Sequence, residues 1–288
     1  MLPAPILPDL SRCSCHDGTG AGVGTAERAF NLVMTQYDQQ CALEFAELQP
    51  RFDEYFVEMA VECPYHLPRE AVFYQALFAP IPERVMELFL AQGYRRNGNC
   101  LYAMHCRGCS ACVPIRLRPQ ELRLNRNQRR VMKKNQDLEI EIGPVQLSPV
   151  NLALCQKFLS HRYPHKNNQA ESYYSGFFLT AIVSCLEIRY RLDGRLVGCA
   201  IVDVGENWLN AVYFYFDPTE ARRSLGTFNI LTLAEFCRMR QMDFLYLGYY
   251  IESVAAMNYK SRFMPHYLYL EGRWVVKDRN NKGGATYA

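Results

Sequence analysis

Apolar and polar residues alternate regularly over three neighbouring segments in the second half of the chain. Residues 186–192, 196–204 and 207–216 each show the period of two that is typical of a strand, and Asp193-Gly194 supplies a turn between the first two. Residues 227–240 then carry apolar side chains at helical spacing, and residues 244–247 return to a strand pattern. The pattern therefore predicts an antiparallel meander followed by a helix and a further strand.

The first half has a more mixed pattern. Pro82 precedes a helical pattern that ends before Gly93, and Asn97-Gly98 predicts a hairpin between Tyr94 and Tyr102. The other elements expected here are a weakly helical segment at residues 26–50, a strand at 71–79, a short basic helix at 125–135, a strand at 138–142 and a helix at 151–161.

These elements predict an α+β protein with two domains, which suits a chain of 288 residues. We expect a small, basic, cysteine-bearing N-terminal domain at residues 26–145. A C-terminal domain at residues 146–288 is expected to hold a mixed, mainly antiparallel sheet. Residues 1–25 are rich in Pro, Gly and small polar residues, and they predict a flexible tail.

The order of three strands, a glycine-bearing loop, a helix and a strand is that of the GNAT-like acyltransferase fold. In that fold a glycine-rich loop at a helix N-terminus holds the pyrophosphate of coenzyme A. Residues 223–228 (RSLGTF) keep only half of such a loop, because the second glycine is missing. An ordinary helix N-terminus is an equally good interpretation, and coenzyme A binding is not expected.

Composition excludes several classes of protein. Hydrophobic residues make up 49% of the chain and charged residues 21%, which is close to the average of soluble globular proteins. No apolar stretch reaches the length of a membrane span, and the first ten residues lack the pattern of a signal peptide. We expect a cytoplasmic protein without a membrane partner.

Positive charge is concentrated in one segment. Between Arg95 and Lys134 the sequence holds eleven Lys and Arg residues against Glu121 alone, a local charge of +10, whereas the whole chain carries +3. A solvated basic face is the ordinary interpretation of such a run. Because so many like charges repel one another, we favour a nucleic-acid partner whose backbone phosphates neutralise them.

Cysteines form a second candidate site. Cys106, Cys109 and Cys112 follow the spacing C-x-x-C-x-x-C, and Cys63 lies upstream. Four thiolates can hold one zinc ion or one iron–sulfur cluster. The alternative is that these thiols line a small core.

A third candidate site lies in the second half of the chain. Tyr213, Tyr215 and Asp217 stand close together at the end of a predicted strand, and Tyr249, Lys260 and Arg262 follow later. Alternating aromatic residues are often part of a core. Lys260 and Arg262 are better explained by a pocket for a carboxylate, which requires such cations.

The assembled motifs resemble the arginyl/leucyl-tRNA–protein transferase family, and most closely its bacterial aspartate/glutamate leucyltransferase branch. The resemblance covers nearly all of residues 62–274. It rests on CPY (63–65), GYRRNG (93–98), CxxCxACVPIR (106–116), NRNQRR (125–130), YFYFDP (213–218), SLG (224–226), YLGYYI (246–251) and MNYKSRFMP (257–265).

The resemblance implies a reaction and its partners. An aminoacyl group would pass from tRNA to the α-amine of a protein with an N-terminal Asp or Glu, which marks that protein for degradation through the N-degron pathway. Aminoacyl-tRNA would be the co-substrate, and no cofactor would be required for the chemistry. Iron–sulfur binding through the cysteines, here Cys63, Cys106, Cys109 and Cys112, is implied only for some members. The motifs favour leucine over arginine as the donated residue.

Roles for individual residues follow from this resemblance and from the patterns above. The reacting centre is expected at Tyr213, Tyr215, Asp217 and Gly226. Substrate contacts are expected from Arg223, Ser224, Tyr249, Lys260 and Arg262. tRNA contacts are expected from Arg95, Arg96, Arg126, Arg129, Arg130, Lys133 and Lys134.

Two other functions remain open at this point. A small-molecule N-acetyltransferase would need an intact coenzyme A loop, and it has no use for the basic segment. A non-catalytic, zinc-containing nucleic-acid-binding protein would not need the acyltransferase half of the chain.

Overall fold

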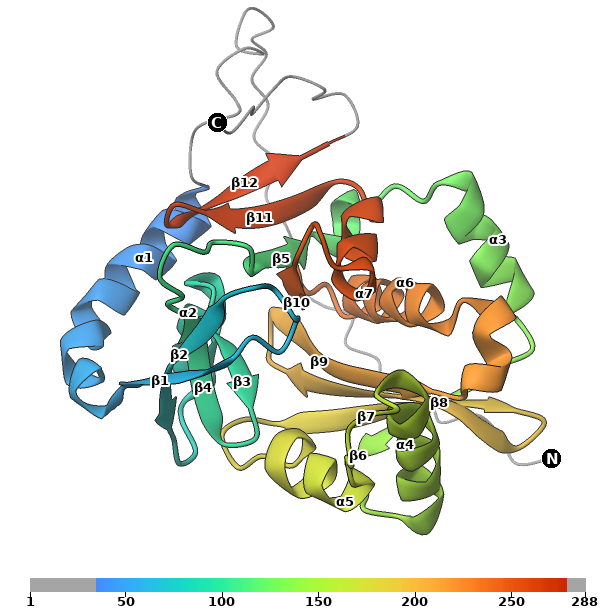
Figure 1. The fold of residues 1–288 in the computed structure, drawn as a ribbon. Helices are drawn as coiled ribbons and strands as arrows, with labels where there is room; N and C mark the ends of the chain where they lie inside the picture. Colours follow the sequence, from blue (N-terminus) through green and yellow to red (C-terminus); the bar gives the residue numbers. More distant parts are fainter. Residues whose placement is uncertain (1–34, 279–288) are drawn as a thin grey trace, which may run out of the picture. The chain divides into compact units, whose positions relative to one another are not determined.

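The strands of the described chain form two sheets (Figure 1). The computed structural model describes residues 35–278, so the tail expected at residues 1–25 lies outside the described part. The strands are β1 (Val57–Glu62), β2 (Glu70–Leu77), β3 (Arg95–Asn97), β4 (Cys100–Met104), β5 (Val113–Leu117), β6 (Glu139–Pro144), β7 (Cys185–Leu192), β8 (Arg195–Val204), β9 (Trp208–Phe216), β10 (Phe244–Tyr250), β11 (His266–Leu270) and β12 (Arg273–Lys277).

Helices connect and cover these sheets. The α-helices are α1 (Gln36–Leu48), α2 (Glu83–Ala91), α3 (Arg126–Lys134), α4 (Pro149–Arg162), α5 (Ala170–Tyr173), α6 (Leu225–Met239) and α7 (Ala255–Asn258). A π-helical turn (Tyr174–Phe178) continues α5, and a 3-10 segment (Pro218–Arg223) precedes α6. The α+β class expected from the sequence is confirmed.

The smaller sheet has the order β1-β2-β4-β3, and the larger has the order β12-β11-β5-β10-β9-β8-β7-β6. The predicted meander is present as β7, β8 and β9, which pair antiparallel. Gly194 has a φ of +78° in the turn between β7 and β8, a conformation that glycine adopts without steric cost. β10 pairs with β9 in parallel, so the larger sheet is mixed and mainly antiparallel, as in GNAT-like acyltransferases.

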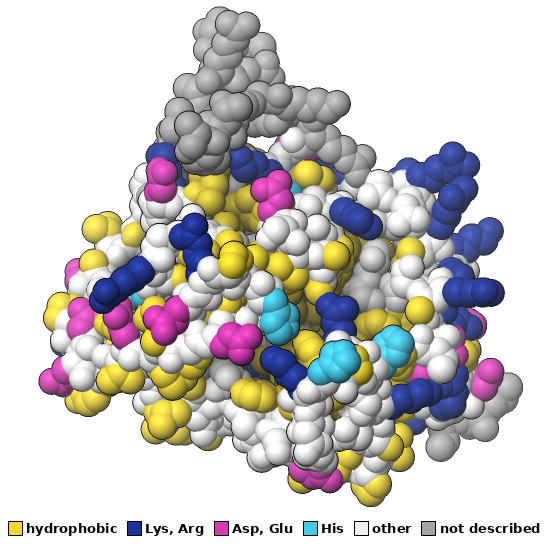
Figure 2. Space-filling view, viewed as in Figure 1, with side chains coloured by type: hydrophobic (Ala, Val, Ile, Leu, Met, Phe, Trp, Pro, Cys, Tyr) yellow, Lys and Arg dark blue, Asp and Glu magenta, His cyan; other side chains and the backbone are white. Residues whose placement is uncertain are grey.

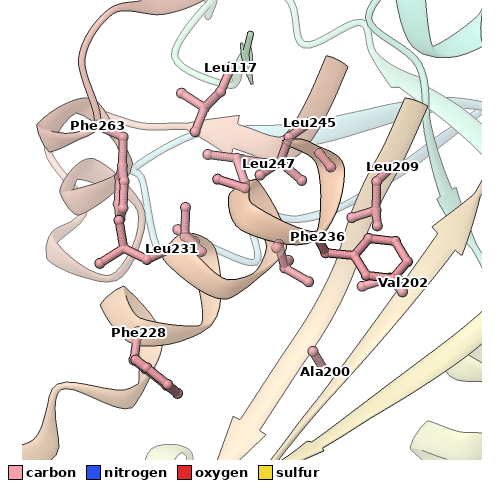
Figure 3. Packing of buried hydrophobic residues seen from close by; sticks show 14 of the residues in the cluster. Leu117, Ala200, Val202, Leu209, Phe228, Leu231, Phe236, Leu245, Leu247 and Phe263 are labelled. Carbon is pink, nitrogen blue, oxygen red and sulfur yellow. The ribbon is translucent and has the colours of Figure 1, made fainter. Parts of the chain in front are cut away.

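The two faces of the larger sheet bury different helices, because successive strand residues point to opposite faces. Leu209, Leu245 and Leu247 face α6, and Figure 3 shows them packed against Leu231 and Phe236 of that helix. The opposite face packs against α1 and α2 through Phe244, Tyr246 and Trp274. It also packs against α4 and α5 through Cys199, Ile201 and Tyr215.

Strands from both sides of residue 145 share the larger sheet. β5 lies between β10 and β11, and β6 pairs with β7 at the sheet edge. The pattern of apolar residues did not indicate β5, since this strand contains Pro114 and Arg116. The two domains expected from the sequence therefore contribute to one sheet, and all described residues belong to one compact unit.

Candidate functional site

The parallel strands β9 and β10 separate from one another partway along their length. They pair over three residues each, ending at Asn210 and Tyr246, although both strands continue further. Beyond this point Gly248 has a φ of +79°, and the register of β10 against β5 shifts, which is the mark of a β-bulge. We call the region between β9 and β10 beyond these last paired residues the strand opening.

The 3-10 segment follows β9 in the chain, and α6 begins soon after that segment. Ser224 precedes α6 in the left-handed conformation, with a φ of +56°, and its carbonyl accepts from the N–H groups of Thr227 and Phe228 at 2.9 and 3.0 Å. A Cβ at Gly226 would lie 3.9 Å from the Tyr259 hydroxyl. N–H groups and the helix dipole at such an end favour negative charge.

A row of tyrosines, which we call the tyrosine row, runs between the separated strands and the cysteine-bearing segment. Its members are Tyr249, Tyr102, Tyr65, Tyr163 and Tyr213. The rings of Tyr102 and Tyr249 lie 6.2 Å apart. Burial raises the pKa of Tyr65, and nearby Tyr102 and Tyr163 raise it further. Burial likewise raises the pKa of Tyr213, and nearby Tyr163 and Tyr173 raise it further. The phenols of Tyr65 and Tyr213 are therefore neutral at physiological pH.

Two cations lie at the Tyr249 end of the tyrosine row. Arg95 is 4% exposed, and it donates to the carbonyls of Tyr94 and Gly248 at 2.6 and 3.1 Å. The Lys260 amine donates to the Tyr249 carbonyl at 2.8 Å. Burial, and secondly the charge of Arg95, lower the pKa of Lys260 to about 7. Figure 2 shows the surface hollowed near β10 and α7, with basic and histidine side chains around the hollow.

Helix α3 presents the exposed basic surface. Asn125 caps it through a capping box with Gln128, and Gln128 and Val131 face inward. The outward residues, all exposed, are Arg126, Arg129, Arg130, Lys133 and Lys134. No Asp or Glu among residues 35–278 forms an ion pair with these five side chains. Figure 2 shows Lys and Arg side chains projecting along the edge that carries α3.

Hydrogen bonds attach α3 to the loops around the N-terminus of α6. The Lys134 amine donates to the Arg222 carbonyl at 2.7 Å, and the Asn135 amide donates to the Arg223 carbonyl at 3.0 Å. Gln128 donates to the Arg262 carbonyl at 3.2 Å. A small cleft between these elements is lined by Asn125, Asn127, Gln128, Thr227, Tyr259, Arg262 and Phe263. The basic helix is therefore held beside the α6 end of the strand opening.

Asp217 and Arg223 are engaged in internal ion pairs. Asp217 is 3% exposed and accepts from Lys157 and Arg195, both at 2.7 Å. Burial opposes ionisation, but the hydrogen bonds from Lys157 and Thr219 lower the pKa of Asp217 to about 2. A carboxylate so fully paired is a poor proton acceptor, which argues against the role expected for it. Arg223 pairs with Asp137 and Glu220.

Three residues expected in functional roles are buried, which argues against the roles expected for them. The Arg96 side chain is 0% exposed and bonds to Asp203 at 2.6 Å, so it has no access to a tRNA phosphate. Arg95 is also buried, so it too is inaccessible to a tRNA phosphate. Tyr215 is fully buried in the core formed with α4 and α5, where its hydroxyl bonds to that of Tyr174. We therefore remove it from the reacting centre.

The four expected metal ligands lie near one another. Burial raises the pKa of Cys112 to about 12, and Cys106, Cys63 and Cys109 also raise it. The Val72 N–H donates to the Cys106 sulfur at 3.3 Å. Within residues 35–278, however, no three His, Cys, Asp or Glu side chains are arranged to hold a metal ion. We derive no step of the reaction from a metal centre.

The sequence patterns did not single out Tyr65, Tyr102 or Tyr163 as site residues. Tyr65 belongs to the CPY motif and Tyr102 follows the GYRRNG motif, but only tertiary contacts bring them to Tyr249. Tyr163 stands in a basic loop after α4, with no local signal that it faces β9. The CPY motif could have suggested Tyr65, which is its last residue.

The sheet order, the separated parallel strands and the helix N-terminus beside them are the features of the GNAT-like fold. Comparison with solved structures gives a GCN5-related N-acetyltransferase from Anabaena variabilis, 12% identical with a TM-score of 0.37, covering 70% of this chain and 45% of that one. The C-terminal domain of a putative lysylphosphatidylglycerol synthetase from Agrobacterium fabrum is 15% identical with a TM-score of 0.38, covering 62% and 55%.

Sequence comparison identifies the family within this class. Residues 61–130 match the N-terminal model of arginine-tRNA-protein transferase, and residues 150–270 match its C-terminal model. The aspartate/glutamate leucyltransferase of Marinobacter nauticus is 35% identical over 227 residues, which cover 76% of this chain and 94% of the relative. That of Aeromonas hydrophila is 36% identical over 194 residues, covering 65% and 79%. The chain belongs to the aminoacyl-tRNA–protein transferase family, and it is an aminoacyltransferase.

No helix within the described residues combines the length and the apolar character that crossing a membrane requires.

Proposed function

We propose that this enzyme transfers leucine from Leu-tRNA to the α-amine of proteins that begin with Asp or Glu, in the cytoplasm, as an entry into the N-degron pathway. The observation that carries the proposal is the juxtaposition of an exposed basic helix with the opening between β9 and β10. The names of the relatives, aspartate/glutamate leucyltransferases, support the donor and the acceptors.

In this proposal α3 binds the tRNA backbone. Its five exposed cations form no ion pair with the described carboxylates, so they are available to phosphates. Attachment of α3 to the loop before α6 would direct the 3′ end of the tRNA toward Gly226 and the strand opening. Arg262, which lines the small cleft beside α3, would contact the same end.

The reaction needs positioning more than activation, since an aminoacyl ester is already reactive. The neutral α-amine attacks the ester carbonyl, a C–N bond forms, and the C–O bond to the terminal ribose breaks. The ribose hydroxyl leaves with the proton that the amine loses. Donors placed at the transient oxyanion stabilise the transition state. We assign this role to the Tyr213 hydroxyl and the backbone N–H group of Gly226.

Tyr213 is a suitable donor because it stays protonated. Burial raises the pKa of its phenol above the ordinary value, and the residue lies on β9 past the point where the strands separate. Its ring is held by Phe178 at 5.0 Å and by Tyr173 at 6.0 Å. A ring supported in this way keeps its hydroxyl in one place, as oxyanion stabilisation requires.

The proposed reaction is tested by incubating the purified enzyme with radiolabelled Leu-tRNA or Arg-tRNA and peptides beginning with Asp, Glu or Ala. We expect label from Leu-tRNA on the Asp and Glu peptides only. Transfer from Arg-tRNA alone would replace the donor, and absence of transfer from both would refute the proposal. Tyr213→Phe is expected to lower the single-turnover rate by about 10²-fold or more, the usual cost of one oxyanion donor.

A further inference from the structure

Arg95 and Lys260 are two neighbouring cations without an acidic partner. Arg95 comes from β3 of the smaller sheet, and Lys260 follows α7. They are close enough that the charge of Arg95 lowers the pKa of Lys260. Among residues 35–278, neither of them forms an ion pair with an Asp or Glu.

Two polar groups in and around this pair lack a hydrogen-bond partner. The Nε of Arg95 and the hydroxyl of Tyr249 are buried, and both lack a hydrogen-bond partner. The residues that carry them are each 4% exposed. Backbone carbonyls of Tyr94, Gly248 and Tyr249 accept from the two cations, but these carbonyls carry no full negative charge. Burying charge without a counter-ion is costly, so this arrangement suits a ligand that supplies the charge.

The Lys260 amine lies next to β10, in the region where β9 and β10 have separated. A Cβ at Gly248 would lie 3.7 Å from that amine, which is an ordinary contact distance, so the amine lies directly beside the bulge. The rings of Tyr102 and Tyr249 border the same region, 6.2 Å apart. A ligand that reaches the cations therefore passes the opening where the ester is proposed to react.

We propose that Arg95 and Lys260, with the Tyr249 hydroxyl, bind the side-chain carboxylate of the acceptor's first residue. This inference rests on the proposed function, and it moves Arg95 from tRNA binding to acceptor selection. A carboxylate on one or two methylenes can reach buried Arg95 and half-buried Lys260, whereas a backbone phosphate carries a ribose on each side. RNA phosphates have the exposed cations of α3 available to them.

The chemistry accounts for discrimination between Asp and Asn. An amide occupies nearly the same volume as a carboxylate, but it leaves the two cations without a counter-ion. Sites that hydrogen-bond a charged group reject the neutral analogue strongly, because the polar groups of the site are then left unpaired. Acceptor selection would therefore depend on charge rather than on size.

Two measurements on the full chain test the inference. The first measures peptide binding without tRNA. Its readout is the shift in the enzyme's melting temperature that peptides beginning with Asp or Asn produce. The second is the ratio of kcat/KM for Leu transfer to the same two peptides. We expect Lys260→Gln to lose the Asp-specific shift and to raise KM for the Asp peptide about 10- to 100-fold. Lys260→Arg keeps the charge, and it is expected to retain most of the selectivity.

Arg95→Lys and Arg95→Gln form the second pair of variants. Arg95 also supports the bulge, so the urea unfolding midpoint is measured for each variant. We expect Arg95→Lys to fold and to keep part of the preference for Asp, and Arg95→Gln to lose it. Affinity for uncharged tRNA should stay at the wild-type value in all four variants.

The outcomes separate this inference from the proposed function. Folded Lys260→Gln and Arg95→Gln variants with the wild-type Asp/Asn ratio would overturn the carboxylate subsite. A fall in tRNA affinity with an unchanged ratio would assign the cations to RNA phosphate instead, which also overturns it. A wild-type enzyme that binds the Asp peptide but transfers nothing from any aminoacyl-tRNA would refute the proposed reaction and leave the subsite standing.

Discussion

The guanidinium of Arg116 donates two hydrogen bonds to the carboxylate of Asp38, at 2.7 and 2.8 Å, and joins α1 to the centre of the larger sheet. The guanidinium carbon of Arg116 also lies 4.1 Å from the ring centroid of Phe244 and 4.2 Å from that of Trp274. The side chains of Asp38 and Arg116 are 3% and 1% exposed. This buried ion pair therefore secures the first described helix to β5.

Asp38→Ala tests how much that ion pair stabilises the fold. Removing the carboxylate leaves the Arg116 charge buried without a counter-ion, and such a change costs about 3–5 kcal/mol. We expect the free energy of unfolding in urea to fall by that amount. Glu47→Ala is the matched control, because Glu47 is exposed on the same helix; its effect should stay within about 0.5 kcal/mol. Equal effects of the two substitutions would contradict the assigned role.

Arg130→Gln combined with Lys133→Gln tests the contribution of α3 to tRNA binding. Both side chains are exposed, and neither pairs with a described carboxylate, so stability should not change. The slope of log affinity against log salt should become shallower by about 0.7 to 0.9 for each phosphate that the double variant no longer neutralises. Arg51→Gln, an exposed arginine outside α3, is the control. An unchanged slope in the double variant would place tRNA on another surface.

Binding of acidic peptides should weaken as the pH rises through about 7. Lys260 must be charged to attract a carboxylate, and burial followed by the charge of Arg95 lowers its pKa to about 7. The amine is charged below this pH and becomes neutral above it. Tyr102 and Tyr249, which lie near it, have raised pKa values and do not titrate in this range. KM for the Asp peptide should therefore increase from about pH 6 to about pH 8.5.

Lys260→Arg is the control for this pH dependence, since a guanidinium stays charged over the whole range. We expect a flat KM profile for the variant between the same limits. If both enzymes show the same increase, the titrating group is elsewhere.

Tyr213→Phe and Tyr215→Phe should have opposite consequences, although the two residues lie on the same strand. Tyr215 is fully buried, and its hydroxyl bonds to that of Tyr174. Its removal leaves a buried hydroxyl without a partner, at a cost of about 1–3 kcal/mol in the free energy of unfolding. Single-turnover measurements should show a normal rate for Tyr215→Phe and a reduced rate for Tyr213→Phe. A slow Tyr215→Phe enzyme would return Tyr215 to the reacting centre.

Local patterns in the sequence determined most of the second half of the fold. The meander, the turn at Asp193-Gly194 and the helix after Gly226 depend on residues close together in the chain, and all are present in the structure. The basic helix is also confirmed, because its capping residues Asn125 and Gln128 act locally. Motif spacing was likewise sufficient to recognise the transferase family.

Only the tertiary structure decided which charges and aromatic rings face a ligand. Arg96, Arg116 and Arg130 stand in one basic segment, yet the first two are buried against Asp203 and Asp38 while the third is exposed. A count of charges cannot show this difference, because burial depends on partners 107 and 78 residues away along the chain. The tyrosine row and the Arg95 and Lys260 pair arise in the same way, from segments distant in sequence that meet where β9 and β10 separate.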